Sequence, residues 1–252
     1  MTADNIMKVC DRHFGIGSDG ILLGSKLKND ISKLRIYNPD GSEAEKSGNG
    51  LRIFMSHLYR NNHQGKIMKV ETLGGIVDGN VLDDNGDILK INMGIPVFDS
   101  EKIPLNRGEN MINEPLIINS EEIKLTAISI GNPHAVYFTD ELDTERFKFI
   151  GPLIENHECF RNRTNVQAVR VIDRNTIDIL IWERGAGFTL ASGSSSCAAA
   201  FVSNYLGFAD NKIEVRMPGG QINIMIEKES SIQMKGEVTF IYEGVSNFKF
   251  QI

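Results

Sequence analysis

The sequence has few cysteines and no pattern typical of a metal site. Its 252 residues include three widely separated cysteines, Cys10, Cys159 and Cys197, with no CxxC pair. An odd number of isolated cysteines favours a reducing compartment over a disulfide framework. The five histidines form no ligand spacing with one another or with the cysteines. We therefore expect no bound metal.

Long apolar runs and an excess of positive charge are also missing. No apolar run approaches the roughly 18 residues that a membrane span requires, and the opening MTADNIMKVC lacks the charged and apolar regions of a signal peptide. The net charge of −6 argues against nucleic acid or an anionic membrane as the main partner. We expect a cytoplasmic protein that binds no nucleic acid and no membrane, and whose partner is a small polar molecule.

A nucleotide loop is not present either. GIGSDG (15–20) is not a Walker motif, and it is not a complete GxGxxG followed by a helical pattern. No nucleotide cofactor is predicted from it.

What the sequence does contain is a series of short apolar or alternating segments that favour a β-rich fold. Gly, Asn, Asp and Pro separate these segments. With 41% hydrophobic residues, the chain is long enough for one large or two small domains. The predicted strands lie within 20–25, 33–38, 66–72, 76–82, 88–94, 126–131, 134–139, 165–172, 176–183, 213–219, 222–227 and 232–245.

Two segments instead have a helical pattern. In 48–62 the apolar residues Leu51, Phe54, Met55 and Leu58 share one face by the three-four spacing. In 194–208 the small residues would let a helix pack deeply against a sheet. Each segment begins next to a Ser-Gly pair.

The order of these elements predicts an α+β fold with two pseudo-symmetric halves, 1–120 and 121–252. RIYNPDGSEAEKSGNG (35–50) corresponds in order to IDILIWERGAGFTLASGSSS (177–196). We place the boundary near residue 120 because 108–122 is the longest stretch without strong periodicity. Each half would be a curved, mostly antiparallel sheet around one central helix, with both helix N-termini facing an interdomain cleft.

The two Ser-Gly turns are candidate anion sites. A helix N-terminus leaves its first N–H groups unpaired and carries partial positive charge, so it can hold a carboxylate. The alternative is that Ser47 and Ser192 are ordinary helix N-caps. For an isolated serine that alternative is favoured, and the duplication brings the two interpretations close to even. The carboxylate would be held by the N–H groups of Gly48, Asn49, Gly193 and Ser194.

Polar residues end the strand that precedes each turn. Asn38 lies nine residues before Ser47, and Glu183 lies nine residues before Ser192. Arg184 could clamp a carboxylate with two hydrogen bonds, and Glu183 could act as a base or orient one. A surface Glu-Arg pair is the alternative, and it is favoured for such a pair alone.

The segment SIGNPHAVYF (129–138) adds two further candidates. The Asn-Pro pair forces an extended or turn geometry at Asn132, and His134 can titrate near neutrality. A single histidine at the start of a strand is more often structural.

Taken together, these phrases resemble the diaminopimelate epimerases, a family of amino-acid epimerases that use no cofactor. The phrases occur in the family's order over roughly residues 9–225, and those around 38–52 and 183–197 are highly specific. The resemblance rests on DRHFGIGSDGILL, YNPDGSEAEKSGNGLR, NMGIP, GNPHAV, NVQAV, ERGAGFTLASGSSSCAAA and PGG.

The resemblance implies a two-base mechanism without pyridoxal phosphate on twin domains. One group would remove the α-proton of an amino acid such as diaminopimelate, and the opposite group would deliver a proton. It implies that Ser47 and Ser192 occupy the two catalytic positions, assisted by His134 and Glu183. The implied substrate-binding residues are Asn38, Gly48, Asn49, Asn132, Asn165, Arg184, Gly193 and Ser194. A homodimer is also implied.

This sequence departs from the family pattern at both catalytic positions, where the family has cysteine. A thiol is partly ionised near neutrality, whereas a serine hydroxyl needs an adjacent base. Cys197 should face the core, because five residues after Ser192 it lies about 140° around the helix. Cys159 lies in a loop near Asn165 and is a weak replacement. The family also begins with a strand and a turn bearing a substrate-binding asparagine, and this chain opens at a stretch resembling the segment that comes after that turn.

Three functional hypotheses remain open from the sequence. The first is an epimerase or racemase that uses the serine pair. The second is a degenerate relative that binds an amino acid without turnover, and a related interpretation is that both cysteines were exchanged on purpose to trap a substrate complex. The third is a related isomerase that transfers protons through Glu183.

Overall fold

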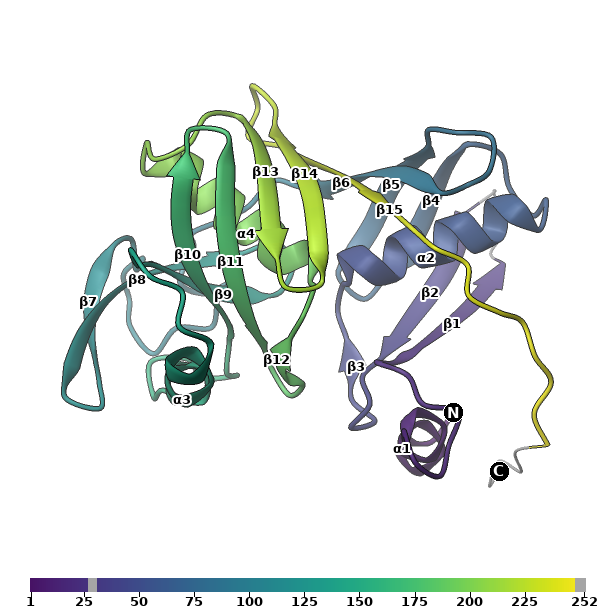
Figure 1. The fold of residues 1–252 in the computed structure, drawn as a ribbon, viewed down its shortest axis with the longest axis horizontal. Helices are drawn as coiled ribbons and strands as arrows, with labels where there is room; N and C mark the ends of the chain where they lie inside the picture. Colours follow the sequence, from purple (N-terminus) through teal and green to yellow (C-terminus); the bar gives the residue numbers. More distant parts are fainter. Residues whose placement is uncertain (27–30, 248–252) are drawn as a thin grey trace. The chain divides into compact units, whose positions relative to one another are not determined.

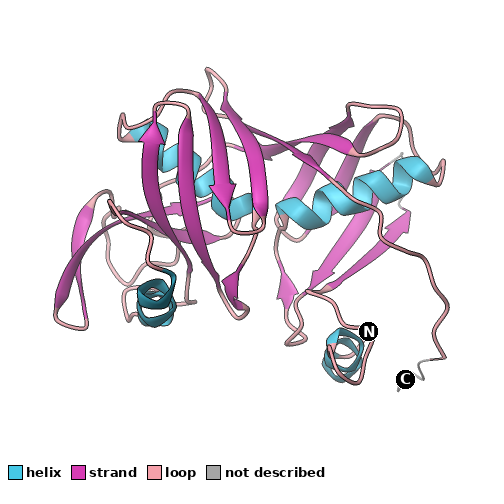
Figure 2. Cartoon of the chain, viewed as in Figure 1, coloured by secondary structure: helices cyan, strands magenta, loops and turns pink. Residues whose placement is uncertain are grey.

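The computed structural model describes residues 1–26 and 31–247 of the chain, which form a mixed α/β structure (Figures 1 and 2). By their internal contacts these residues divide into two compact units, Met1–Ile91 together with residues 237–247, and Asn92–Gly236. Within the described ranges, no helix is both long and apolar enough to cross a membrane.

Unit 1 is a sheet with one long helix packed on it. Its strands run in the order β1-β2-β4-β5-β6, and the short β3 pairs with β2. All these pairings are antiparallel except β2–β4, which is parallel and is connected through α2 (Gly48–Arg60). The other elements are α1 (Ala3–Cys10), β1 (Ile21–Lys26), β2 (Ile31–Tyr37), β3 (Glu43–Ala44), β4 (Ile67–Thr72), β5 (Gly75–Val81) and β6 (Ile88–Gly94).

Helix α2 is amphipathic, as its sequence pattern predicts. Leu51 and Met55 are fully buried, whereas Ile53 on the opposite side is 48% exposed. Close packing of α2 on the sheet depends on a glycine in β5, because a Cβ at Gly79 would lie 2.2 Å from the sulfur of Met55. In Figure 1, α2 crosses the strands of this unit on one face.

Unit 2 is a larger curved sheet with a helix on each side. Its strands follow the order β15-β14-β13-β11-β10-β9-β8-β7, and β12 pairs with β11. The pairs β9–β10 and β11–β13 are parallel and are connected through α3 (Thr144–Glu155) and α4 (Gly193–Tyr205). The strands are β7 (Glu114–Ile118), β8 (Glu121–Ser129), β9 (Pro133–Phe138), β10 (Asn165–Asp173), β11 (Thr176–Glu183), β12 (Gly187–Thr189), β13 (Lys212–Met217), β14 (Gly220–Ile226) and β15 (Ile232–Glu237).

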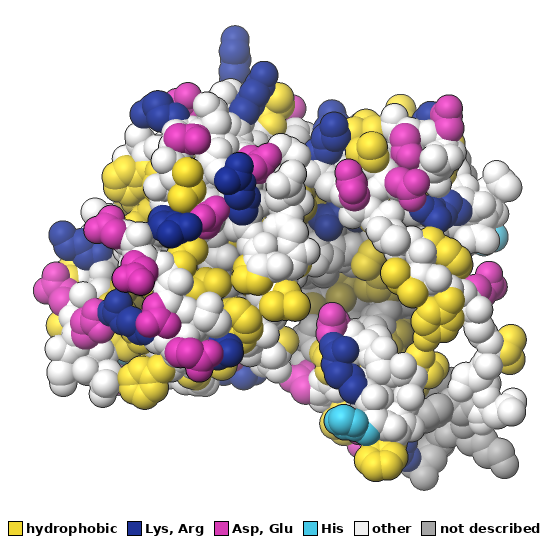
Figure 3. Space-filling model, in the orientation of Figure 1, with side chains coloured by type: hydrophobic (Ala, Val, Ile, Leu, Met, Phe, Trp, Pro, Cys, Tyr) yellow, Lys and Arg dark blue, Asp and Glu magenta, His cyan; other side chains and the backbone are white. Residues whose placement is uncertain are grey.

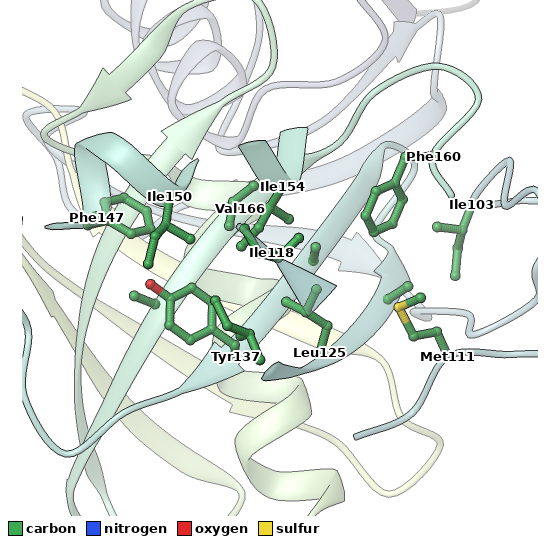
Figure 4. Close-up of a cluster of buried hydrophobic side chains, with 14 of the residues drawn as sticks. Ile103, Met111, Ile118, Leu125, Tyr137, Phe147, Ile150, Ile154, Phe160 and Val166 are labelled. Atoms are coloured by element: carbon green, nitrogen blue, oxygen red, sulfur yellow. The ribbon is translucent and has the colours of Figure 1, made fainter. Parts of the chain in front are cut away.

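Successive side chains of a strand point alternately toward α3 on one face of the sheet and α4 on the other. In β10, Val166 and Ala168 join the apolar cluster under α3, which Figure 4 shows with Phe147, Ile150 and Ile154 of that helix. Gln167, between them, points to the opposite face and contacts α4. The sheet is therefore covered on both faces at its centre, and α4 is buried along Gly193–Ser203.

The outer surface of unit 2 has charges of both signs. In Figure 3, basic and acidic side chains are interspersed over the visible face of this unit. Several of them form exposed ion pairs, such as Arg146 with Glu121 and Lys148 with Glu145. Exposed pairs of this kind contribute little to stability.

The α+β class is confirmed, and the predicted strands are found within one to a few residues, but several elements were not predicted. Helices α1 and α3 and strands β3, β7 and β12 have no counterpart in the sequence interpretation. The predicted strand 232–245 was too long, because β15 ends at Glu237. The bounds of the two compact units also differ from the predicted boundary near residue 120.

Strand β7 lies within the stretch that suggested the boundary, and its turn explains why the pattern was hidden. Ile118 pairs with Glu121, so only Asn119 and Ser120 connect β7 to β8. Both have positive φ, 48° and 67°, as a type I′ hairpin turn requires. Glycine is preferred at the second position of such a turn. This chain has Ser120 there, so the sequence signal for a hairpin is weak.

We expect the substitution Ser120→Gly to stabilise the protein by about 1 kcal/mol, because glycine adopts positive φ without the steric penalty of a Cβ atom. Urea denaturation of the two proteins measures the difference. Ser120→Ala keeps the Cβ and should give no such gain. Equal stability of the glycine and alanine variants would contradict the proposed strain.

Candidate functional site

Both Ser-Gly turns form the same local structure. Ser47 caps α2 with φ −138° and ψ 120°, and Ser192 caps α4 with φ −148° and ψ 126°. The Ser47 Oγ accepts a hydrogen bond from the Gly50 N–H at 3.1 Å, and the Ser192 Oγ accepts one from the Ser195 N–H at 3.5 Å. Each capped helix has 13 residues. The two serines are therefore N-caps, and this holds whether or not they also have a chemical role.

The chain leading to each cap is also repeated. The short strands β3 and β12 pair antiparallel with the long strands β2 and β11, respectively. β3 ends at Ala44, three residues before Ser47, and β12 ends at Thr189, three residues before Ser192. Each unit thus contains a long strand, a turn, a short strand, a serine cap and a helix in the same order.

In unit 1, Asn38 directly follows β2 and its amide closes the turn to β3. The Asn38 side chain donates to the Ser42 Oγ at 3.0 Å, and its backbone N–H donates to the Ser42 carbonyl. Asp40 accepts from the N–H and the hydroxyl of Ser42. The side chain of Asn38 is therefore used by its own loop.

A cavity in unit 1 lies away from these residues. It has a volume of about 510 Å³ and lies between β1, β2 and the middle and C-terminal part of α2. None of the predicted site residues lines it, so the repeated motif and not the size of the cavity locates the candidate site. Its lining residues are Leu22, Gly24, Ser25, Ser32, Ile53, Phe54, His57, Leu58 and His63.

In unit 2, the structure brings five predicted residues to one end of three neighbouring strands. β9 and β10 are parallel and begin at this end, with His134 opposite Asn165. β11 is antiparallel to β10 and ends here at Glu183. Asn132 precedes β9 and Arg184 follows β11. This topology gathers residues that lie 52 positions apart in the sequence.

His134 is completely buried on the α4 side of the sheet. Burial is the main cause that lowers its pKa to about 3, and the positive charge of Arg184 lowers it further, whereas Gln167 opposes the shift. The Nε2 atom lies 2.9 Å from the Asn132 Oδ1. His134 is therefore a neutral imidazole at neutral pH, closer to the structural alternative than to a group that titrates near neutrality.

Gln167 was not singled out in the sequence, and it connects His134 to the capped helix. Its Nε2 donates to the Ser195 Oγ at 3.0 Å in a fully buried pair. Its Oε1 and the Nδ1 of His134 are buried without a hydrogen-bond partner of normal geometry, although Gln167 is near enough to act on the pKa of His134. The signal in the sequence is one polar residue in the otherwise apolar run VQAV (166–169).

Asn165 holds the backbone of both neighbouring strands. Its Nδ2 donates to the Pro133 carbonyl at 2.8 Å, and its Oδ1 accepts from the Arg184 N–H at 2.9 Å. Both ends of the amide are thus used within the protein. Arg184 itself makes a long contact, 3.4 Å, from its Nη1 to the Asn162 carbonyl.

Glu183 lies on the face of the sheet that contacts α4. Its neighbour Trp182 joins the cluster under α3, and successive side chains of a strand point to opposite faces. The Glu183 Oε2 accepts from the Thr189 Oγ1 at 3.3 Å. A carboxylate is thus present on the same face as the Ser192 cap.

The cysteines do not provide a replacement thiolate. Cys197 is completely buried in α4, as its position around the helix predicted. Burial raises the pKa of Cys159 to about 11, so that its thiol stays protonated near neutrality. Among the described side chains, no group of three or more His, Cys, Asp or Glu could hold a metal ion.

Comparison with known proteins identifies the family. Residues 2–98 and 126–241 match the family described as Diaminopimelate epimerase. The chain belongs to this family. Diaminopimelate epimerase 2 of a Nostoc species is 46% identical over 247 residues, covering 97% of this chain and 86% of that protein. The diaminopimelate epimerase of Caldanaerobacter subterraneus is 38% identical, covering 94% and 88%.

Solved structures share the fold of this family member at low identity. A probable proline racemase from Agrobacterium radiobacter has a TM-score of 0.73 and 13% identity, covering 97% of this chain and 81% of that one. A hydroxyproline epimerase from Agrobacterium vitis has a TM-score of 0.71 and 14% identity, covering 95% and 79%. The fold class predicted from the sequence is thus found in proteins named as racemases and epimerases.

The low pKa of His134 predicts a loss of stability in acid. Its pKa is about 6.5 when unfolded and about 3 when folded, so protonation favours the unfolded chain. The stability that depends on a neutral His134 is complete above about pH 6.5. The free energy of unfolding should fall by about 2 kcal/mol between pH 6.5 and pH 5. Urea denaturation of the wild type and His134→Gln at both pH values measures the difference in slope.

The matched control is His157→Gln, which removes a histidine elsewhere in unit 2. It should keep the acid slope of the wild type. If His134→Gln leaves the pH dependence of the free energy of unfolding unchanged, His134 does not stay neutral in the folded protein.

Proposed function

We propose that this protein inverts the configuration at the α-carbon of diaminopimelate and interconverts its LL and meso forms, a step of lysine and peptidoglycan-precursor synthesis. The observation that carries the proposal is the repeated motif of strand, turn, short strand, serine cap and helix in a chain of the diaminopimelate epimerase family. A reaction that must treat two faces of one carbon atom needs two groups of similar kind, and the repeated motif supplies two.

The proposed chemistry is a two-base proton transfer without a cofactor. A group at one catalytic position takes the α-proton, and the electron pair of the broken C–H bond moves into the substrate carboxylate. The group at the other position then delivers a proton to the opposite face of the α-carbon. Ser47 and Ser192 take these two positions.

A serine hydroxyl needs help in this role, because it is far more basic than a thiol once ionised and holds its proton near neutrality. We assign the help to Glu183 and His134. Glu183 lies on the α4 face of its sheet, the side of the Ser192 cap, and its carboxylate could take the hydroxyl proton. His134, whose pKa of about 3 makes it a weak base, would assist as a neutral hydrogen-bonding group. The alternation of β11 supports the assignment of Glu183, and the burial of His134 supports a neutral, hydrogen-bonding role for this residue.

Substrate binding is assigned to the helix N-termini and to the strand ends. The first N–H groups of a helix and its dipole favour a carboxylate, and we assign this role to Gly48, Asn49, Gly193 and Ser194. Arg184 supplies a positive charge for the same group. Asn38, Asn132 and Asn165 are the remaining assigned residues, although Asn38 and Asn165 also bond within the protein.

The setting of the reaction belongs to the same proposal. We infer a cytoplasmic enzyme that acts as a homodimer, and sedimentation velocity at micromolar concentration tests the dimer. The dimer is not needed for the proton chemistry described above.

We expect the protein to exchange the α-hydrogen of LL- or meso-diaminopimelate with solvent. Proton NMR of either compound incubated with the protein in D₂O should show loss of the α-proton signal, because each cycle returns a proton from the solvent. Common amino acids, tested in parallel, should retain their signals. Retention of the diaminopimelate signals would contradict turnover by the serine pair.

The double substitution Ser47→Cys and Ser192→Cys should raise this exchange rate by about two orders of magnitude, since a thiol ionises much more readily than a hydroxyl. Ser203→Cys is the matched control, because Ser203 is buried in α4, 11 residues after Ser192, and bonds only to the Ala199 carbonyl in the hydrogen bonds seen for its side chain. Exchange in the double variant alone would contradict turnover by the wild type and favour the alternative of a protein that binds without turnover. No exchange in either protein would contradict the proposed function.

A further inference from the structure

The turn that carries Glu183 and Arg184 rests on a buried carboxylate from another element. Glu155 is the last residue of α3, and its side chain is only 7% exposed. Its Oε1 accepts from the Gly185 N–H at 3.0 Å, and its Oε2 accepts from the indole Nε1 of Trp182 at 2.7 Å. Glu155 thus binds the chain on both sides of Glu183 and Arg184.

Burying this carboxylate at the C-terminal end of a helix costs free energy, and its hydrogen-bond partners must offset that cost. A buried carboxylate loses its hydration, and the C-terminal end of a helix repels negative charge. No basic residue lies in the last turn of α3. The compensation comes from Gly185, from Trp182 and from Arg163, whose Nη1 lies 3.1 Å from the Oε1.

Helix α3 is also shaped to receive Trp182. Gly151 lies one turn before Glu155, and a Cβ at Gly151 would lie 3.0 Å from the indole ring. The absence of that Cβ lets the ring lie close against the helix, with its Nε1 at the carboxylate. Gly151 and Glu155 together therefore fix both the plane and the polar edge of the indole.

A second side chain, that of Asn165, holds Arg184, which lies between Trp182 and Gly185. The Asn165 Oδ1 accepts from the Arg184 N–H at 2.9 Å, so two consecutive backbone N–H groups, of Arg184 and Gly185, are bound by side chains from β10 and α3. Gly185 has φ 78°, which bends the chain sharply at this point. The direction in which Glu183 and Arg184 leave the sheet is set by these contacts.

We propose that Glu155 is a positioning residue of the active site, which aims the Glu183 carboxylate and the Arg184 guanidinium by holding the turn at Gly185. The inference rests on the proposed function for its effect on catalysis. The anchoring itself does not depend on any substrate.

Glu155→Gln tests the anchoring, because an amide of the same shape has one accepting oxygen where the carboxylate has two. It must leave either the Gly185 N–H or the indole N–H facing its own NH₂ group. We expect the Gly185 amide to exchange with D₂O about tenfold faster, measured by NMR without substrate. Trp182 is the single tryptophan of the chain, so a shift of its emission maximum and stronger quenching by acrylamide report the other contact directly.

The effect on catalysis is measured as α-hydrogen exchange of diaminopimelate. We expect kcat/KM to fall by about 10- to 100-fold in Glu155→Gln, with KM raised because Arg184 is misplaced and kcat lowered because Glu183 is misplaced. Trp182→Phe removes the indole N–H, which competes with the Gly185 N–H for the one accepting side-chain oxygen that remains in the Glu155→Gln variant. In the Trp182→Phe background, Glu155→Gln should therefore lower kcat/KM less.

Two control variants separate positioning from general stability. Ile154→Val removes a buried methyl group in the same turn of α3 and should lower the melting temperature without changing KM. Glu145→Gln removes an exposed carboxylate of the same helix and should change neither. A loss of kcat/KM in Ile154→Val equal to that in Glu155→Gln would overturn the proposal.

The two proposals fail in different ways. If Glu155→Gln leaves the exchange of the Gly185 amide and the emission of Trp182 as in the wild type, Glu155 does not hold the turn and the inference is wrong. If no variant and no wild-type protein turns over diaminopimelate, the proposed function is wrong, and the amide and fluorescence measurements still decide the anchoring.

Discussion

Unit 2 depends on one constraint, namely that helix α4 is buried on all sides. Every residue from Gly193 to Ser203 is removed from solvent, so the helix has no polar side to present to water. Most of its buried side chains are small, and its buried hydroxyls must bond within the protein. Ser196 and Ser203 donate to carbonyls one turn earlier, at 2.7 Å each, and Ser195 receives the amide of Gln167.

The neighbourhood of the N-terminus of α4 is polar but low in charge. His134 is neutral, and Gln167 and Asn165 are amides whose hydrogen bonds join strands to one another or to α4. Two charged residues of the candidate site, Glu183 and Arg184, come from the end of a strand and from the turn that follows it. A site of this kind can bind a carboxylate through helix amides and one guanidinium, while most of its polar atoms maintain the geometry.

Much of this arrangement could be predicted from the sequence. The apolar alternation and the glycines located most strands, and the two Ser-Gly pairs marked the starts of both capped helices to within a residue. The contributions of Gln167 and Glu155 could not be predicted, because each depends on pairing between elements distant along the chain. Glu155 in the segment ENHECF reads as a surface acid, and only the packing of α3 on β11 buries it. Strand β7 was hidden because Asn-Ser, and not Asn-Gly, forms its turn.

The parallel strand pairs carry a consequence for folding. Parallel neighbours cannot be joined by a tight turn, and the pairs β2–β4, β9–β10 and β11–β13 are each closed by a crossover that contains a helix. Both serine caps lie inside such crossovers. Closing a crossover costs chain entropy before the strands can pair. The caps are therefore ordered only by the cooperative event that completes each sheet, and a ligand bound at a cap would slow the unfolding of the whole crossover.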